Sequence, residues 1–171
     1  LGSNDSSYGV GIALSDCPDG RSKIRALIRE FSARPRVVVL DDDRLILRMT
    51  RDALMAAGYS VFLAETCERA IDLAREVGPV AVVLDLLVNG ATSACVATAL
   101  RRTPATRAVP IVIHSGRPLE EASRIMSELA LDGLVRKRRD FSALVDKVTE
   151  LTHGRTHAIE NSAVRFAEIA R

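Results

Sequence analysis

Val37-Val-Val-Leu-Asp41-Asp42-Asp43 is the stretch that decides the fold of this chain. Four consecutive apolar residues, three of them β-branched, predict a short strand that is buried on both faces. Three carboxylates follow directly, and residues 45–57 then show apolar side chains at helical spacing, ended by Gly58. A buried strand that leads through an acidic turn into a helix is the repeating unit of a parallel α/β sheet.

The same strand-then-helix order recurs along the chain. Further apolar runs predict strands near 59–63, 80–84, 111–113 and 134–135. Helical spacing predicts helices near 68–77, 92–102, 120–131 and 141–151, and Gly78-Pro79 is a stop signal after the first of these. We therefore expect an α/β domain of doubly wound topology, a five-fold βα repeat whose parallel sheet is covered by helices on both faces.

Composition divides the chain into three regions. Residues 1–35 comprise a Gly-, Ser- and Asp-rich flexible arm followed by a short amphipathic helix, 36–153 form the α/β domain, and 154–171 form a helical tail. Both flanking helices carry an apolar stripe. We expect each stripe to be buried, either on the domain or in a homodimer.

Composition also excludes several classes of protein. The 171 residues are 47% hydrophobic and 27% charged, which suits one globular domain. The 24 basic and 22 acidic residues nearly cancel, so no overall field favours nucleic acid. The longest stretch without charge, 86–100, is shorter than the roughly 20 residues of a membrane span. Cys17, Cys67 and Cys95 are scattered and odd in number, which favours a reducing, cytoplasmic location.

Polar side chains follow four of the predicted strands. Asp41-Asp42-Asp43 ends the first, Asp85 the third, Ser115-Gly116 the fourth and Lys137 the fifth. Ligands of open parallel sheets bind beyond the carboxyl ends of the strands, so we expect these groups around one point. Clustered carboxylates repel unless a cation lies among them, and oxygen ligands with open positions suit Mg²⁺. One carboxylate can then attack a phosphoryl group, while the lysine and hydroxyl bind its oxygens.

In these motifs the segment 36–153 resembles the receiver domain of two-component response regulators. The matching stretches are Val37–Asp43, Val82–Leu86, Val109–Gly116 and Asp132–Lys137. Asp85 lies 44 residues after Asp41, Ser115 lies 30 further on, and Lys137 another 22. The resemblance implies a flavodoxin-like sheet with strand order 2-1-3-4-5.

The resemblance also implies a role for each residue. Asp41, Asp42 and Asp85 would hold Mg²⁺ together with the backbone carbonyl of Leu87. Asp85 would accept a phosphoryl group from a histidine kinase or a histidine phosphotransfer protein, making the chain a signalling module rather than an enzyme in the usual sense. Ser115 and Lys137 would bind the phosphoryl oxygens.

Three positions depart from the family pattern. Val88-Asn89 stands where the family usually has Met-Pro, Leu134 where it has an aromatic residue, and Arg138 where a proline follows the lysine through a cis bond. A cis bond before a residue other than proline costs about 2.5–4 kcal/mol, which favours a trans bond between Lys137 and Arg138.

Two other functions fit part of the pattern. Asp41-Asp42-Asp43 contains the Asp-x-Asp of a Mg²⁺-dependent phosphatase of the haloacid-dehalogenase type, although Asp85 would then have no role. A pseudo-receiver scaffold, which works without phosphorylation, is the second alternative.

For Asp43 alone we expect a helix cap. The basic run 136–139 has no recognition helix beside it, so we expect no direct DNA binding.

Overall fold

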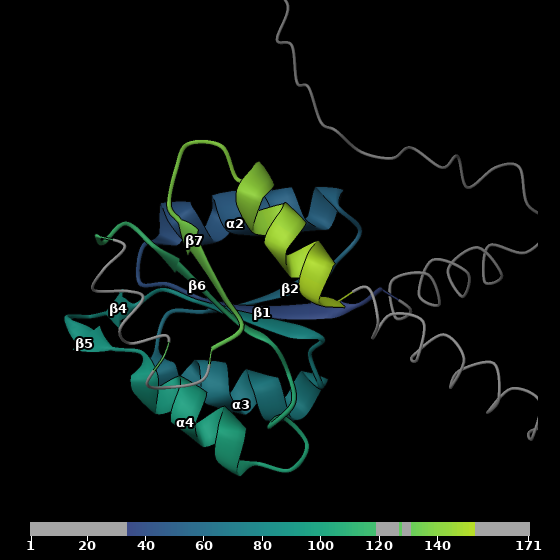
Figure 1. The fold of residues 1–171 in the computed structure, drawn as a ribbon, viewed down its shortest axis with the longest axis vertical. Coiled ribbons are helices and arrows are strands. Elements are labelled where there is room, and N and C mark those ends of the chain that lie inside the picture. Colours follow the sequence, from purple (N-terminus) through teal and green to yellow (C-terminus); the bar gives the residue numbers. More distant parts are fainter. Residues whose placement is uncertain (1–33, 119–126, 128–130, 153–171) are drawn as a thin grey trace, which may run out of the picture. The chain divides into compact units, whose positions relative to one another are not determined.

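The structure is a computed structural model that describes residues 34–118, 127 and 131–152. Its main sheet has five parallel strands in the order β2-β1-β3-β6-β7, drawn in Figure 1. This is the predicted order 2-1-3-4-5, because β6 and β7 are the fourth and fifth strands of this sheet. Each strand begins and ends within two residues of its predicted limits. The strands are β1 (Arg36–Leu40), β2 (Ser60–Ala64), β3 (Ala81–Leu84), β6 (Ile111–Ser115) and β7 (Gly133–Arg136).

Helices cover both faces of this sheet, as the buried strands require. In Figure 1, α2 (Arg44–Ala56) and the helix at 142–152 lie on one face, and α3 (Cys67–Val77) and α4 (Ala94–Arg102) lie on the other. The helix expected over 120–131 falls mainly outside the described residues. The arm, the amphipathic helix before residue 33 and the tail after 153 fall outside them too, so the proposed domain limits stay predictions.

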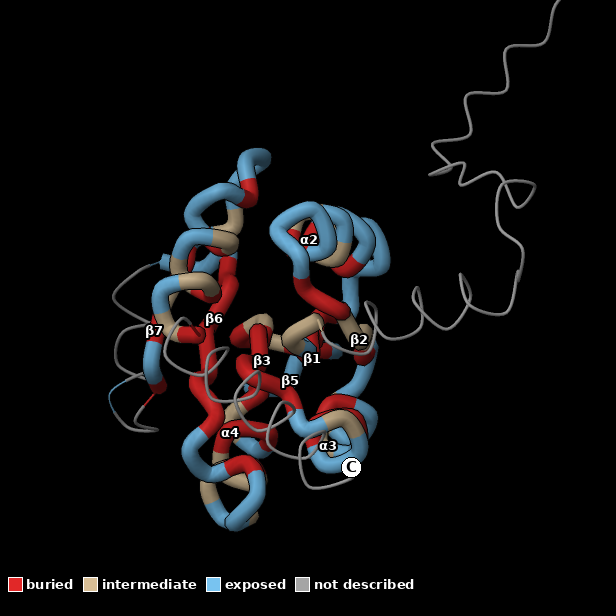
Figure 2. Tube along the Cα trace, turned by 90° about the vertical axis from the view of Figure 1, so that its right-hand side faces the viewer, coloured by how far each residue is buried: buried red, intermediate tan, exposed pale blue. Residues whose placement is uncertain are grey.

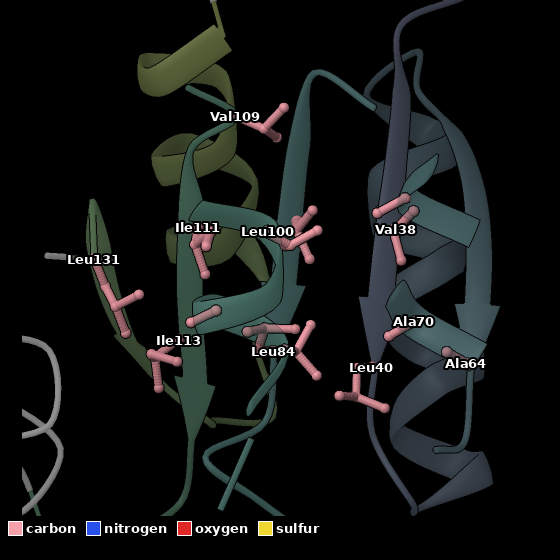
Figure 3. Packing of buried hydrophobic residues seen from close by; sticks show 14 of the residues in the cluster. Val38, Leu40, Ala64, Ala70, Leu84, Leu100, Val109, Ile111, Ile113 and Leu131 are labelled. Carbon is pink, nitrogen blue, oxygen red and sulfur yellow. The ribbon is translucent and has the colours of Figure 1, made fainter. Parts of the chain in front are cut away.

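Two apolar clusters, one on each face of the sheet, hold the layers together. Val37 and Val39 point into one cluster with Leu54 of α2, while Val38 and Leu40 point into the other with Leu100 of α4. Figure 2 shows the buried strands between half-exposed helices, and Figure 3 shows side chains of the second cluster. Alternate residues of the run 37–40 are thus buried on opposite faces of the sheet. This is why all four are apolar, rather than apolar and polar in alternation.

The strand register places the polar residues at one edge. Leu40 of β1 is paired with Ala64 of β2 and with Leu84 of β3, and Leu84 is paired with Ile113 of β6. Because the strands are parallel and in step, Asp41 and Asp85 leave the sheet at the same level. Ser115 and Arg136 are likewise paired, so Lys137 follows at that edge.

The segment after β3 differs from the prediction. A helix was expected from residue 92, but a two-stranded hairpin, β4 (Leu87–Val88) and β5 (Ala91–Thr92), precedes α4, which begins at Ala94. The turn residues Asn89 and Gly90 have φ angles of 51° and 78°. Asn-Gly is the dipeptide that adopts this two-residue turn most readily, and this is why the chain forms a hairpin before the helix.

Two further observations concern the peptide bond after Lys137 and the length of the helices. No cis peptide bond occurs among the described residues, so Lys137 and Arg138 are joined in trans, as the missing proline favours. Within that same part of the chain, no helix combines the length and the apolar character that crossing a membrane requires.

Candidate functional site

Lys137 joins two carboxylates at the carboxyl edge of the sheet. Its ammonium nitrogen Nζ lies 2.6 Å from Oδ2 of Asp41 and 2.7 Å from Oδ2 of Asp85. The side chains of Asp41 and Asp85 are only 3% and 14% exposed, and that of Lys137 is 19% exposed. The three groups come from β1, β3 and β7, so the sheet brings together residues that are up to 96 positions apart.

Burial and ion pairing shift the pKa values of Asp41 and Lys137. Burial raises the pKa of Asp41, although the hydrogen bonds from Lys137 and from the Asp43 amide oppose that change. Burial by itself lowers the pKa of Lys137, but the hydrogen bonds to Asp41 and Asp85 outweigh it, so the pKa of Lys137 is raised. The lysine therefore keeps its proton and its charge beside the two carboxylates.

Asp42 completes a cluster of three carboxylates. One oxygen from each of Asp41, Asp42 and Asp85 lies within 4.8 Å of the others. With Lys137 included, three negative charges face one positive charge. The donor set is made of oxygen only and carries two uncompensated negative charges, which fits a small divalent cation such as Mg²⁺.

The hairpin turn is attached to this cluster through Asn89. The backbone amide of Asn89 donates a 2.8 Å hydrogen bond to Oδ2 of Asp42, and its side-chain amide donates to the carbonyl of Glu65 at 3.4 Å. Asn89 was not among the predicted site residues. The local signal in the sequence is the Asn89-Gly90 pair, which is typical of a two-residue hairpin turn.

Leu87, two residues after Asp85, is the first residue of β4 in this hairpin. Leu87 stands opposite Thr92, and the amide of Ser93 donates to the carbonyl of Leu86 at 3.0 Å. Hydrogen-bonded and non-bonded pairs alternate in an antiparallel ladder, so Leu87 occupies the non-bonded position. The ladder therefore does not use its carbonyl, which keeps Leu87 available as an oxygen ligand.

Ser115 lies at the end of β6 and is 2% exposed. Its hydroxyl oxygen accepts a 3.2 Å hydrogen bond from the backbone amide of Arg117, and its carbonyl accepts one from the Lys137 amide at 2.8 Å. The second bond ties the loop that carries Lys137 to β6. Ser115 thus lies at the predicted strand end, with its hydroxyl in a local turn.

Asp43 has a different role from its two neighbours. Its Oδ1 accepts hydrogen bonds from the amides of Leu45 at 2.8 Å and Ile46 at 3.3 Å, which makes Asp43 the N-cap of α2. The prediction of a cap is confirmed. A phosphatase of the haloacid-dehalogenase type would need the Asp43 carboxylate as an acid in its active site. In this structure the same carboxylate caps α2 instead.

Comparison with known proteins gives one family match. The response regulator receiver domain family model matches residues 37–149, which is most of the segment predicted to be the α/β domain. A curated relative, response regulator MprA of Mycolicibacterium vanbaalenii, is 37% identical over 82 residues. That alignment covers 48% of this chain and 35% of MprA, so the chain matches about a third of that relative's length.

Solved structures share the fold. Chemotaxis protein CheY4 of Vibrio cholerae has a TM-score of 0.65 at 19% identity, covering 69% of this chain and 98% of that protein. A sensor protein from Polaromonas sp. JS666 gives 0.65 at 24% identity, covering 71% and 98%. Response regulator TrrA of Thermotoga maritima, solved with Mg²⁺ and BeF, gives 0.61 at 25% identity, covering 68% and 98%.

Proposed function

Because this chain belongs to the response regulator receiver domain family, we propose that it acts in the cytoplasm as a phosphoacceptor of a two-component phosphorelay. Asp85 takes the phosphoryl group from a phosphohistidine. The observation that carries this proposal is the bridge from Lys137 to both Asp41 and Asp85, at 2.6 and 2.7 Å. A half-buried lysine held beside a reactive carboxylate is placed to neutralise the charge of a group that arrives there.

The contacts of Asp85 orient its attack. The backbone amide of Leu86 donates to Oδ1 at 2.7 Å, while Lys137 donates to Oδ2. One carboxylate oxygen forms the bond to phosphorus as the bond from phosphorus to the imidazole nitrogen breaks, and the electron pair of that bond returns to the imidazole. Lys137 then pairs with a phosphoryl oxygen, and the Ser115 hydroxyl donates to another after turning from the Arg117 amide.

Asp41, Asp42, Asp85 and the carbonyl of Leu87 are the groups that would hold Mg²⁺. When bound, this ion would offset the negative charge that the phosphoryl oxygens bring to the carboxylates. The protein's own contribution is to keep three carboxylates close together against their repulsion. It does so with the Lys137 ammonium, with the Asp43 amide on Asp41 at 3.0 Å, and with the Asn89 amide on Asp42.

Mass spectrometry of the intact chain tests the proposal. Incubation with acetyl phosphate and Mg²⁺ should add one phosphoryl group, and omission of Mg²⁺ or the substitution Asp85→Asn should prevent it. Asp43→Asn is the matched control, because Asn caps a helix as well as Asp does. A label that survives Asp85→Asn but is lost in Asp43→Asn would favour the phosphatase instead, and no label on the parent chain would favour the scaffold.

Calorimetry tests the metal separately. Combining Asp42→Ala with Asp85→Ala should weaken Mg²⁺ binding at least tenfold, about 1.4 kcal/mol, because two of the three carboxylates are removed. Asp72→Ala removes one negative charge from the exposed face of α3 and should leave the affinity unchanged. Equal affinity in the double variant and the parent would place the metal elsewhere.

We propose that the phosphohistidine partner docks on a groove beside Lys137. The groove has a volume of about 400 Å³ and combines an apolar floor with cationic residues. Its lining residues are Ile46, Met49, Phe141, Lys137, Arg138 and Arg139. Leu45, in the first turn of α2, is also exposed, although it does not line the groove. Apolar surface next to the acceptor suits a helix that carries the donor histidine.

Met49 and Met55 provide a matched pair to test this surface. Both lie on α2 and are 37% and 36% exposed, but only Met49 lines the groove. Met49→Glu should slow phosphoryl transfer from a phosphorylated histidine phosphotransfer protein tenfold or more and leave labelling by acetyl phosphate unchanged. Met55→Glu should change neither rate. If both variants transfer at the parent's rate, the partner docks on another surface.

A further inference from the structure

Strand β2 lies at one end of the five-stranded sheet, as Figure 2 shows. Among the residues that the structure describes, no strand pairs with its outer edge. On its inner side, the Ser60 amide donates to the carbonyl of Pro35 at 2.9 Å. The Ala64 carbonyl accepts from the amide of Asp41 at 3.2 Å. The backbone groups of Ser60 and Ala64 therefore point into the sheet.

The backbone groups of Val61 and Leu63 point to the outer edge of β2. Successive residues of a strand direct their amides and carbonyls to alternate sides, and Val61 and Leu63 alternate with the residues that face β1. Within the described part of the chain, these outward groups form no hydrogen bond. An edge of this kind is a template on which another extended chain can pair.

A cationic groove of about 320 Å³ lies between this strand and α2. Its lining residues are Arg44, Leu47, Arg48, Arg51, Leu63 and Glu65. The three arginines are spaced i, i+4 and i+7 along α2, which places them on one side of that helix. Three guanidinium groups against one carboxylate leave the groove with a net positive charge above an apolar floor.

Arg48 is the arginine that is open to a partner. Arg44 pairs with Glu65 at 3.1 Å and Arg51 pairs with Asp52 at 2.8 Å, whereas Arg48 is exposed and forms no ion pair with a described residue. The Arg44 and Arg51 pairs are themselves solvent-exposed, and such pairs contribute little to stability. Their arginines can therefore turn toward another carboxylate at small cost.

We propose that β2 and this groove bind an extended acidic segment of a partner protein, which adds to the sheet as a further strand. Its backbone pairs with the outward groups of Val61 and Leu63. Its side chains alternate between the two faces of the sheet. On the face of α2 they are carboxylates that meet Arg48, and on the other face they are apolar and lie beside Phe62, which is only partly buried.

The charge of the groove selects this occupant over a second copy of the chain. Two β2 strands paired about a two-fold axis would place both α2 helices on the same face of the joined sheet, where arginines would repel arginines. The phosphates of a nucleic acid would attract the arginines, but a nucleic acid has no peptide backbone to continue the sheet. The surface is also separate from the groove at Met49, which lies on the other side of α2.

Fluorescence anisotropy with the full chain and a labelled peptide of alternating glutamate and valine tests the proposal. We expect saturable binding that weakens as salt is added, and no binding of a peptide in which lysine replaces glutamate. N-methylation of the peptide backbone at all glutamates or at all valines blocks one edge of the strand in each case. One of these two peptides should lose binding and the other should keep it, because only one edge faces β2.

Two variants of the chain test the two kinds of contact. Arg48→Glu should weaken peptide binding about tenfold, whereas Arg75→Glu, an exposed charge reversal on α3, should not. Val61→Pro removes an outward amide without a bond to β1 and should abolish binding, whereas Val61→Thr keeps that amide and should bind like the parent. Circular dichroism checks that each variant is folded, and the methylated peptides test the same backbone contact if Val61→Pro is not.

Several results would overturn the proposal. These are no binding of the glutamate–valine peptide, equal binding by the parent and Arg48→Glu, retained binding by both methylated peptides, or equal affinity for single-stranded DNA. Labelling of Arg48→Glu by acetyl phosphate should match the parent, since Arg48 contacts no group of the phosphoryl site. The peptide measurements use the unphosphorylated chain, so their outcome does not depend on whether Asp85 accepts a phosphoryl group.

Discussion

His114 should make the free energy of unfolding fall as the pH drops from 7 to 4. Its imidazole is 3% exposed and packs edge-on against Phe141, with 5.6 Å between the ring centroids. Burial, and to a smaller degree the charge of Lys137, lowers the pKa of His114 from its usual 6.5 to about 4. Between pH 6.5 and about 4, the imidazole of His114 is therefore neutral in the folded state and protonated in the solvent-exposed unfolded chain.

The sign and size of the effect follow from linkage. Between pH 6.5 and 4 the unfolded chain binds a proton at His114 that the folded chain does not bind, so stability is lost as the pH falls. A pKa difference of two to three units corresponds to about 3 kcal/mol at pH 4, and about 2 kcal/mol is already lost at pH 5. Above pH 7 the contribution of His114 vanishes.

Urea unfolding at pH 7 and pH 5, followed by far-UV circular dichroism because the chain has no Trp, measures this loss. The variant His114→Gln keeps a polar side chain but cannot titrate. Between the two pH values the parent should lose about 2 kcal/mol more than the variant. His153 and His157 are present in both proteins and cancel. An identical pH dependence for parent and variant would refute the reasoning.

Three further predictions concern turnover, the helix cap and the tail. The double variant Leu87→Asn with Arg117→Glu should hydrolyse the phosphoryl label about tenfold faster, which lowers the activation barrier by about 1.4 kcal/mol. In the parent, the Leu87 side chain offers no hydrogen bond and Arg117 offers no base to orient the attacking water. The decay is followed by intact mass, and equal decay rates in the parent and the double variant would contradict this. Asp43→Ala should cost about 1 kcal/mol in urea unfolding and Asp43→Asn almost nothing, since only the first removes the cap of α2. Removal of residues 156–171 should either change the oligomeric state, measured by sedimentation, or lower the melting temperature. If neither changes, the apolar stripe of the tail is not buried on the domain or in a dimer.

The sheet and the ends of its strands were predictable because they follow from local patterns. The apolar run 37–40 must be buried on both faces, and the rule that parallel strands end together then places Asp41, Asp85 and Lys137 at one edge. The structure adds the distances between these groups. It also confirms the cap at Asp43, which a carboxylate before a helical period predicts.

Features that depend on packing between distant elements were not predictable. The bond from the Asn89 amide to Asp42 depends on how the hairpin turn meets the loop that follows β1. By contrast, the hairpin itself had a local signal in Asn89-Gly90, which the helical spacing after residue 92 obscured.

Mapping the phosphoryl label to a residue is the measurement that tests the central claim most directly. The chain is labelled with acetyl phosphate and Mg²⁺, the acyl phosphate is reduced with borohydride, and the position of the resulting homoserine is read from tryptic peptides. The structure predicts homoserine at position 85, within peptide 76–101. Homoserine at position 41, within peptide 37–44, or no modified aspartate in a chain that binds Mg²⁺, would contradict the assignment of Asp85 as the phosphoacceptor.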